Sequence, residues 1–190
     1  MGGDGLWYDA GVIGERAPAP GRLALLQAFV NSVDLELDTD DLSNSKAATA
    51  WLNAHGVGAR RLSEVDRRRL VAVREGLREL LASHPPPTAV AASRLERLLG
   101  KARFRLAVSA SGGALVAEGD DVDAFFGELA AIMVEAGIDG RWQRLKVCRN
   151  DLCRWAYYDH SKNGRGSWCT MRTCGSRAKA RAYRARQRTT

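Results

Sequence analysis

The sequence predicts a mostly α-helical protein with one small β-hairpin. A helical N-terminal domain of residues 1–140 is followed by a small module of residues 141–190 that ends in a basic helix. Three observations lead to this prediction. Apolar residues recur at helical spacing through most of the first 140 positions. A stretch near residue 105 instead alternates apolar and polar residues. All four cysteines lie between residues 148 and 174, where the charge also changes sign.

The first third of the chain predicts an arm, two helices and a loop. Residues 1–20 are rich in Gly, Pro and Ala and predict an irregular arm. A helix is expected within 22–33, and the acidic segment 34–44 is interpreted as a solvated loop that lacks the ligand pattern of a calcium site. A second helix runs from Ser45, an expected N-cap, to Gly56. The apolar positions of the two helices are Leu23, Leu26, Phe29 or Val30, Val33 and Trp51.

Two further helices are predicted in the middle of the chain. The longer begins after Ser63, an expected N-cap, and ends before three prolines at 85–87. The next covers 88–100. His55 and His84 lie near helix ends and are interpreted as solvated or capping, because no spacing supplies a catalytic partner. The expected inward-facing residues are Val65, Leu70, Val73, Leu77, Leu80, Leu81, Leu95, Leu98 and Leu99.

A hairpin and one more helix complete the first domain. Within 102–118, alternating apolar residues on both sides of Gly112 and Gly113 predict a β-hairpin. Residues 120–137 return to helical spacing, and the domain ends near Gly140. The predicted buried residues of this region are Phe104, Leu106 and Val108 in the hairpin, and Val122, Phe125, Phe126, Leu129, Ile132 and Met133 in the helix.

The charge is divided unevenly between the two parts. Residues 141–190 contain fourteen Lys and Arg against two acidic residues, a net charge of +12, whereas residues 1–140 carry −5. A basic excess this concentrated favours a polyanionic partner over a merely solvated surface. No apolar run approaches the roughly 18 residues of a membrane span, and no signal-peptide pattern is evident. We therefore expect a cytoplasmic protein whose thiols stay reduced.

The cysteines are spaced as two pairs, Cys148-x4-Cys153 and Cys169-x4-Cys174, separated by fifteen residues. Each pair can present two thiolates from a tight turn, which favours one tetrahedral, structural Zn²⁺ per chain. The spacing does not match a plant-type iron–sulfur cluster or a redox pair. His160 lies between the pairs, but four thiolates leave it no vacancy. A closed shell of four thiolates has no open position for catalysis, so the metal is expected to fold the module.

The aromatic residues of the module have two interpretations. Trp155, Tyr157, Tyr158 and Trp168 are expected to form a small core around the metal. The alternative is that Tyr157 or Tyr158 stacks on a nucleic-acid base, since aromatic side chains also provide stacking platforms.

After Cys174 the sequence is rich in Ala and Arg and free of Pro, which predicts a helix beginning near Gly175. Four arginines of this helix share one face, and Lys179 and Arg186 lie on a neighbouring face. Such a helix suits the major groove of duplex DNA or the flanking phosphates. The candidate nucleic-acid contacts are Arg165, Arg172, Arg177, Lys179, Arg181, Arg184, Arg186 and Arg188.

The module resembles the CGNR zinc finger. The resemblance is carried by Asp159, Ser161 and Asn163 in a loop, by Trp168, Cys169 and Met171, and by Cys174, Gly175, Ser176 and Arg177. Ser176 stands where the signature has Asn, and Arg165-Gly-Ser carries fewer basic residues than usual before Trp168. The upstream segments LALLQAFVNSVD, WLNAHG and REGLRELL are similar to the ABATE domain, the usual partner of this finger. The resemblance implies a stress-induced transcription regulator of bacteria.

Several functions are compatible with these features. The leading hypothesis is a DNA-binding regulator, associated with the nucleoid, whose N-terminal domain senses a small-molecule effector or mediates association. The alternatives are an RNA-binding or ribosome-associated zinc protein, and an adaptor whose basic helix meets an acidic partner, including the acidic domain itself. An enzyme is not expected, because the sequence contains no nucleophile–base pair or cofactor fingerprint. A homodimer is expected, because one short finger offers few phosphate contacts.

Overall fold

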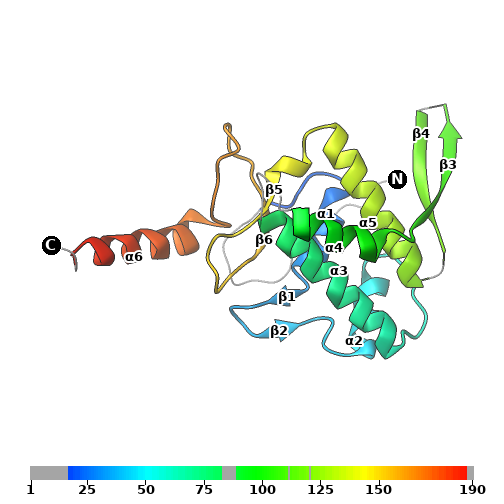
Figure 1. Cartoon of the computed structure of the whole chain (residues 1–190), viewed down its shortest axis with the longest axis horizontal. Helices are drawn as coiled ribbons and strands as arrows, with labels where there is room; N and C mark the ends of the chain where they lie inside the picture. Colours follow the sequence, from blue (N-terminus) through cyan, green and yellow to red (C-terminus); the bar gives the residue numbers. More distant parts are fainter. Residues whose placement is uncertain (1–16, 83–88, 111, 120, 188–190) are drawn as a thin grey trace.

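A computed structural model describes residues 17–82, 89–110, 112–119 and 121–187 of the chain (Figure 1). Most of the predicted N-terminal arm, His84, the three prolines at 85–87 and Arg188 lie outside the described residues. Within the described ranges, no helix is long and apolar enough to cross a membrane.

The fold is mostly α-helical, as the sequence predicts. The helices of the body are α1 (Leu23–Val30), α2 (Ser45–Ala54), α3 (Glu64–Ala82), α4 (Ala89–Leu99) and α5 (Asp121–Ile138), and the C-terminal helix is α6 (Ser176–Gln187). Short helical turns η1 (Trp142–Arg144) and η2 (Met171–Gly175) precede the last strand pair and α6. The strands form three antiparallel pairs: β1 (Val33–Asp34) with β2 (Thr39–Asp40), β3 (Arg103–Ser109) with β4 (Gly112–Glu118), and β5 (Leu145–Val147) with β6 (Ala156–Tyr158). Only the β3–β4 pair was predicted.

The core of the body lies between α1, α2, α3 and α5. Phe29 of α1 contacts Phe125 of α5 edge-to-face, with 5.0 Å between ring centroids, and lies 5.5 Å from the Trp51 ring. The prediction that Trp51 is a core residue is therefore confirmed. Apolar residues from all four helices join this cluster, and burial of each large side chain contributes about 1.5–3 kcal/mol.

The helix starts were predicted to within one residue. Ser63 caps α3, since its Oγ accepts the N–H of Asp66 while Asp66 Oδ2 accepts the Ser63 N–H. The N-cap of α2 is Asn44, whose Oδ1 accepts the N–H of Ala47 at 2.9 Å, and the prediction of Ser45 was wrong. Val65 was also assigned wrongly to the core. It is 58% exposed.

The acidic segment contains a short hairpin where only a loop was predicted, but residues 35–39 are exposed, as expected for a solvated segment. Asp34 Oδ1 accepts the backbone N–H groups of Glu36 and Leu37, which closes the turn between β1 and β2. Asp40 accepts two hydrogen bonds from Arg74 of α3, at 2.6 and 2.9 Å, and Arg74 is only 3% exposed. The composition of the segment could not show that Asp40 pairs with Arg74, because the two residues are thirty-four positions apart in the sequence.

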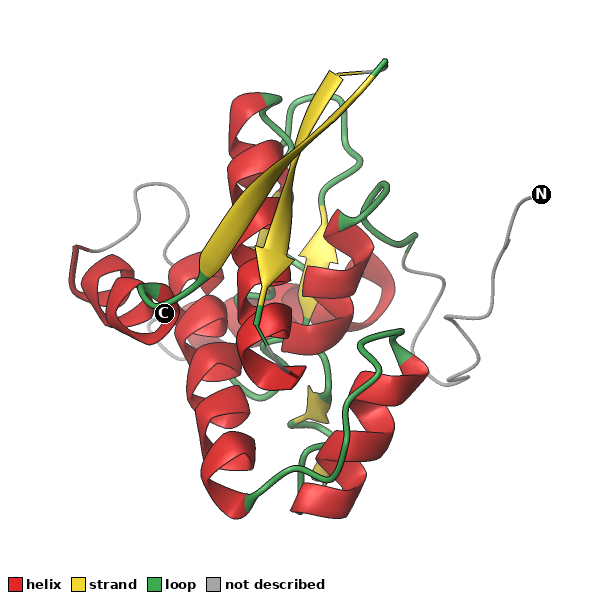
Figure 2. Cartoon of the chain, turned by 90° about the vertical axis from the view of Figure 1, so that its right-hand side faces the viewer, coloured by secondary structure: helices red, strands yellow, loops and turns green. Residues whose placement is uncertain are grey.

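The β3–β4 hairpin packs on α5 at the end of the molecule opposite α6 (Figures 1 and 2). Gly127 of α5 permits the contact, because a Cβ there would lie 2.7 Å from the Cβ of Ala117. The register pairs Leu106 with Leu115, as alternation predicts. Leu106 and Val108 were predicted to be buried, but they are 66% and 77% exposed because the outer half of the hairpin extends beyond α5.

The β5–β6 pair lies inside the core of the body. Leu145, Val147 and Ala156 belong to the same buried cluster as the helices. Asn31, which follows α1, pairs with Ala156 as a strand would: its Oδ1 accepts the Ala156 N–H at 2.7 Å and its Nδ2 donates to the Ala156 carbonyl at 2.9 Å. The first part of the C-terminal segment is thus packed as part of the helical body.

A buried arginine reinforces this attachment. Arg78 of α3 is 1% exposed and donates to the carbonyls of Val30 and Arg154 and to the carboxylate of Glu75. The Arg154 carbonyl belongs to the turn between the first cysteine pair and β6, where Arg154 adopts a φ of 45° that is uncommon for a residue with a side chain. Arg78 therefore holds this turn against α1 and α3.

We predict that Arg78→Ala lowers the free energy of unfolding by about 3–5 kcal/mol, because it leaves buried acceptors and part of an ion pair without a donor. Chemical denaturation of the zinc-loaded chain measures this change. Arg68→Ala is the matched control, since Arg68 is an exposed arginine of the same helix and its loss should cost less than about 0.5 kcal/mol. Equal effects of the two substitutions would contradict the structural role of Arg78.

Candidate metal centre and nucleic-acid interface

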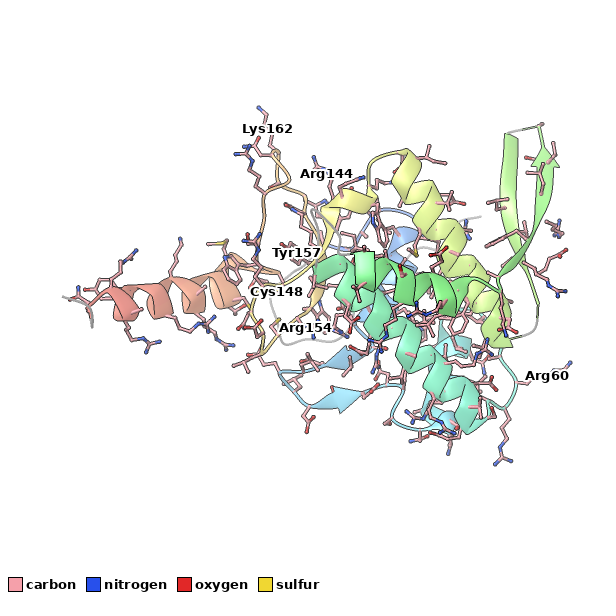
Figure 3. The ribbon with its side chains drawn as sticks, viewed as in Figure 1. Arg60, Arg144, Cys148, Arg154, Tyr157 and Lys162 are labelled. Atoms are coloured by element: carbon pink, nitrogen blue, oxygen red, sulfur yellow. The ribbon has the colours of Figure 1, made fainter. Side chains whose placement is uncertain are left out.

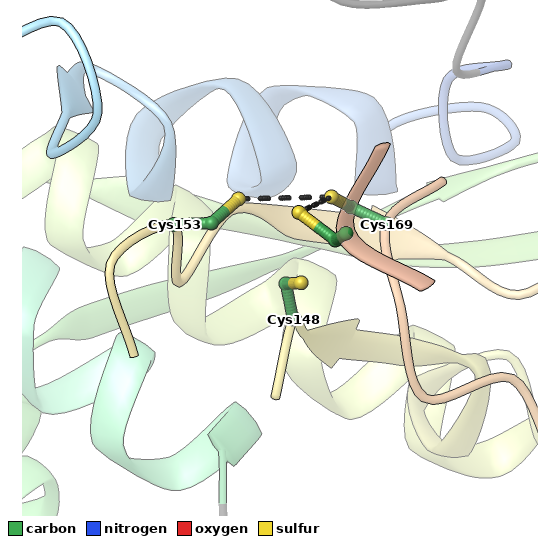
Figure 4. A group of neighbouring side chains, drawn as sticks. Cys148, Cys153 and Cys169 are labelled. Carbon is green, nitrogen blue, oxygen red and sulfur yellow. Dashed lines mark hydrogen bonds between the residues drawn. The ribbon is translucent and has the colours of Figure 1, made fainter. Parts of the chain in front are cut away.

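The four cysteine sulfurs converge on one point. All four Sγ atoms lie within 4.8 Å of one another, and the Cys153–Cys169 and Cys169–Cys174 pairs are each 3.6 Å apart (Figure 4). A tetrahedral zinc site with Zn–S bonds of about 2.3 Å has S–S separations of about 3.8 Å. The sulfurs therefore fit one Zn²⁺ with little movement, and their soft thiolate donors suit that ion.

Two separate arms of the chain supply the ligands. Cys148 follows β5 and Cys153 lies in the turn before β6, so this pair is fixed by the body. Cys169 precedes η2 and Cys174 lies within it, so the second pair is continuous with α6. A metal bound to all four would fasten the basic helix to the core. Figure 3 shows Cys148 at this junction, between α6 and the body.

The cluster is shielded from solvent. Cys148, Cys153 and Cys174 are buried and Cys169 is half-buried. Hydrogen bonds from the Cys153 and Cys169 thiols lower the pKa of Cys148 to about 3, although burial acts in the opposite direction. Metal binding requires the ligands to lose their protons, and these hydrogen bonds favour the thiolate form of Cys148.

The aromatic residues divide between two environments. Trp155 and Trp168 pack against the cysteine cluster, as predicted, whereas Tyr158 packs against the core of the body. Tyr157 is 5% exposed, so it is not available to stack on a base, and burial raises the pKa of its hydroxyl. His160 is exposed and its Nε2 lies 3.3 Å from the Pro18 carbonyl, outside the cysteine cluster.

Gly175 has a steric role at the start of the basic helix. A Cβ at this position would lie 2.7 Å from Met171 Sδ and 3.3 Å from the Trp168 ring. A side chain at this position would therefore require the Met171 side chain to move and would press on the Trp168 ring next to the metal centre.

Asn150 is a site residue that the sequence analysis missed. It is 3% exposed, and its Nδ2 donates to Cys174 Sγ at 3.6 Å. Its Oδ1 faces Arg181 Nη2 at 3.4 Å, so it connects the metal centre to the basic helix. Its backbone carbonyl accepts the N–H groups of Cys153 and Arg154 and closes the turn between the first two ligands. Only the position of Asn150 between two cysteines could have suggested this role.

A buried ion pair shapes the loop that follows β6. Lys146 Nζ donates to Asp159 Oδ2 at 2.7 Å, and the same oxygen accepts the Gly166 N–H at 2.6 Å. Burial would raise the pKa of Asp159, but these bonds and those from Ser161 hold it well below its usual range. A Cβ at Gly166 would lie 2.9 Å from Asp159 Oδ2, so the loop closes tightly around this carboxylate.

The predicted nucleic-acid contacts that the structure describes are all on the surface. Arg165 lies in the loop after β6, Arg172 in η2, and the other described candidates in α6. Figure 1 shows α6 leaving the body as a separate projection. Arg188 lies outside the described residues. The described candidates, each exposed, are Arg165, Arg172, Arg177, Lys179, Arg181, Arg184 and Arg186.

Comparison with protein families agrees with this architecture. The model of the ABATE family, described as "Putative stress-induced transcription regulator", matches residues 21–139. The chain belongs to the ABATE family. The model of the CGNR zinc finger matches residues 144–187, which include the four cysteines and α6. No curated protein matches the sequence. This ABATE protein therefore combines the family's helical domain with a zinc finger built to hold one structural Zn²⁺.

Removal of the metal should release α6 but not the strands. We predict one zinc per chain by metal analysis. After chelation, hydrogen exchange should show loss of protection in η2 and α6, because the ligands that join them to the body are gone. The amides of β5 and β6 should remain protected, since the core and Asn31 hold them. Loss of protection in β5 and β6 to the same extent as in α6 would contradict this division, and adding zinc back serves as the control.

Asn150→Ala should weaken zinc binding about 10- to 100-fold, the usual effect of losing a residue that supports a metal ligand. Competition with a chromophoric chelator measures the affinity. Asn53→Ala is the matched control, because Asn53 is an exposed asparagine of α2 and its loss should leave zinc affinity unchanged. Unchanged zinc affinity of the Asn150 variant would show that the Cys174 contact does not support the metal.

Proposed function

We propose that this ABATE–CGNR protein is a zinc-dependent transcription regulator that binds duplex DNA through its C-terminal module in the bacterial cytoplasm, at the nucleoid. The observation that carries this proposal is the exposed, arginine-rich α6 fastened to the body by the metal centre. Residues 141–190 carry a net charge of +12, and the described basic residues of α6 are exposed to solvent. The basic residues of α6 cover much of its circumference and its apolar residues are mainly alanines, so the helix gains little from packing and a polyanionic partner explains its sequence best.

The dimensions of α6 support contact with duplex DNA. Its twelve residues extend for about 18 Å, and the major groove is about 12 Å wide, enough to admit a helix. Arg177, Arg181 and Arg184 share one face, spaced i, i+4 and i+7. Their guanidinium groups can contact phosphates bidentately, which supports backbone binding more directly than base recognition.

The metal centre explains how such a helix stays folded. An isolated helix of twelve residues is marginal in water, and like charges four residues apart destabilise it further. Attachment of its first turn to the zinc site and Trp168 would supply the missing stability and fix its direction. The proposed role of zinc is therefore to position the helix, which agrees with a non-catalytic protein and a closed shell of ligands.

Effector sensing by the helical body and a homodimeric state remain predictions. The alternative function is RNA binding, because exposed arginines also contact RNA phosphates.

The proposal is tested by selecting bound sequences from random duplex DNA with the zinc-loaded full chain, at two salt concentrations. An enriched motif that persists at the higher salt supports a sequence-specific regulator. Binding without enrichment, lost steeply with salt, would show backbone attraction only. Preference for structured RNA in competition would favour the RNA-binding alternative.

Arg184→Gln should weaken duplex binding and lower the slope of log K against log salt by about 0.9, the value for one lost phosphate contact. Titrations at several salt concentrations measure this slope. Arg105→Gln is the matched control, because Arg105 is an exposed arginine on β3, at the opposite end of the molecule. If both variants change the slope equally, α6 is not the DNA-binding surface.

A further inference from the structure

The acidic β1–β2 hairpin contacts the first turn of the basic helix. Arg177 Nη1 donates to Glu36 Oε1, which joins residues 141 positions apart in the sequence. The side chains are 54% and 26% exposed, so the pair lies at the surface, where an external ligand can reach it. Arg177 is also a candidate phosphate contact. The same guanidinium therefore has an internal carboxylate and an external phosphate as alternative partners.

The hairpin holds Glu36 in place before any ligand arrives. Asp34 Oδ1 accepts the backbone N–H of Glu36 at 2.8 Å and that of Leu37 at 3.0 Å. The other strand is fixed to α3 through Asp40 and the buried Arg74, whose two contacts measure 2.6 and 2.9 Å. An ordered carboxylate loses little conformational entropy on pairing with Arg177, so it competes better than one on a free loop.

The other side of the pair is ordered as well. Arg177 is the second residue of α6, directly after the turn η2 that carries Cys174. The metal centre and Gly175 set the direction of this first turn, and they hold Arg177 within reach of the hairpin. The contact thus joins two preorganised elements of the same chain.

We propose that Glu36 competes with the DNA backbone for Arg177, so that the β1–β2 hairpin limits the affinity of the chain for duplex DNA. This inference rests on the proposed function. Glu36 occupies the Nη1 donor of Arg177, so a phosphate that pairs bidentately through both Nη groups must displace the Glu36 carboxylate, and a phosphate at the remaining donors meets its negative charge. A partner that binds the Glu36 carboxylate in place of Arg177 would free the guanidinium, which would give the ABATE domain a direct physical route to the DNA-binding helix.

The test compares Glu36→Gln with Asp38→Asn in the zinc-loaded full chain. Both substitutions remove one negative charge from the same hairpin. Asp38 is exposed, forms no ion pair among the described residues, and has a φ of 53° that asparagine tolerates. Glu36→Gln should bind duplex DNA about two- to five-fold more tightly than Asp38→Asn at low salt, the range expected for an exposed ion pair. The difference should shrink as salt is raised.

A second pair of variants isolates the contact with Arg177. In an Arg177→Gln background, Glu36→Gln and Asp38→Asn should have equal affinity, because the competing contact is already absent. Equal affinities in the natural background would overturn the inference and leave the proposed function intact. Duplex binding by Glu36→Gln where the natural chain shows none would support it. Absence of duplex binding by both the natural chain and Glu36→Gln would remove the proposed function together with this inference.

Discussion

One buried guanidinium determines how the zinc module sits on the helical body. A charged group without contact to water is costly unless it is well hydrogen-bonded, and each of the three guanidinium nitrogens of Arg78 donates, to Val30 at the end of α1, to Glu75 and to Arg154 directly after the first cysteine pair. The Val30 carbonyl is one of the unpaired acceptors that every helix end leaves. Arg78 thus satisfies a helix end and a zinc turn with one side chain. The location of the metal centre, and of α6 beyond it, depends on this arrangement.

It follows that the two segments matched by the family models do not form two separate domains in the structure. The matches meet between residues 139 and 144, yet the strands that follow are covered by α1 and α3. Cys148 and Cys153 are fixed by the body, and Cys169 and Cys174 are fixed to α6. The metal therefore closes a link between two parts of the chain that are already partly ordered. Movements of α1 or α3 would reach the ligands through Asn31 and Arg78, without a flexible linker between them.

The sequence predicted the features that depend on local patterns. Helix positions followed from apolar spacing, and the metal ligands followed from the spacing of the cysteines, since both signals lie within a few turns of chain. Arg78, Asn150 and Glu36 were not found, because their roles come from partners 76, 31 and 141 residues away. Composition was also a poor guide to the environment of a charged residue whose partner lies far away in the sequence. Most of the acidic segment is exposed, as expected, but its composition did not indicate that Asp40 accepts hydrogen bonds from a buried arginine.

The same long-range pairing changes the meaning of the charge division. A net charge of −5 on residues 1–140 suggests an acidic surface that repels DNA, but Asp40 and Glu75 pair with arginines of α3. Paired charges produce weak fields at a distance, and physiological salt screens exposed charges beyond about 8 Å. The acidic group with the strongest electrostatic effect on α6 is therefore Glu36, which contacts this helix. Because Glu36 touches Arg177 itself, the proposed influence of the ABATE domain on the basic helix rests on this one carboxylate more than on the net charge.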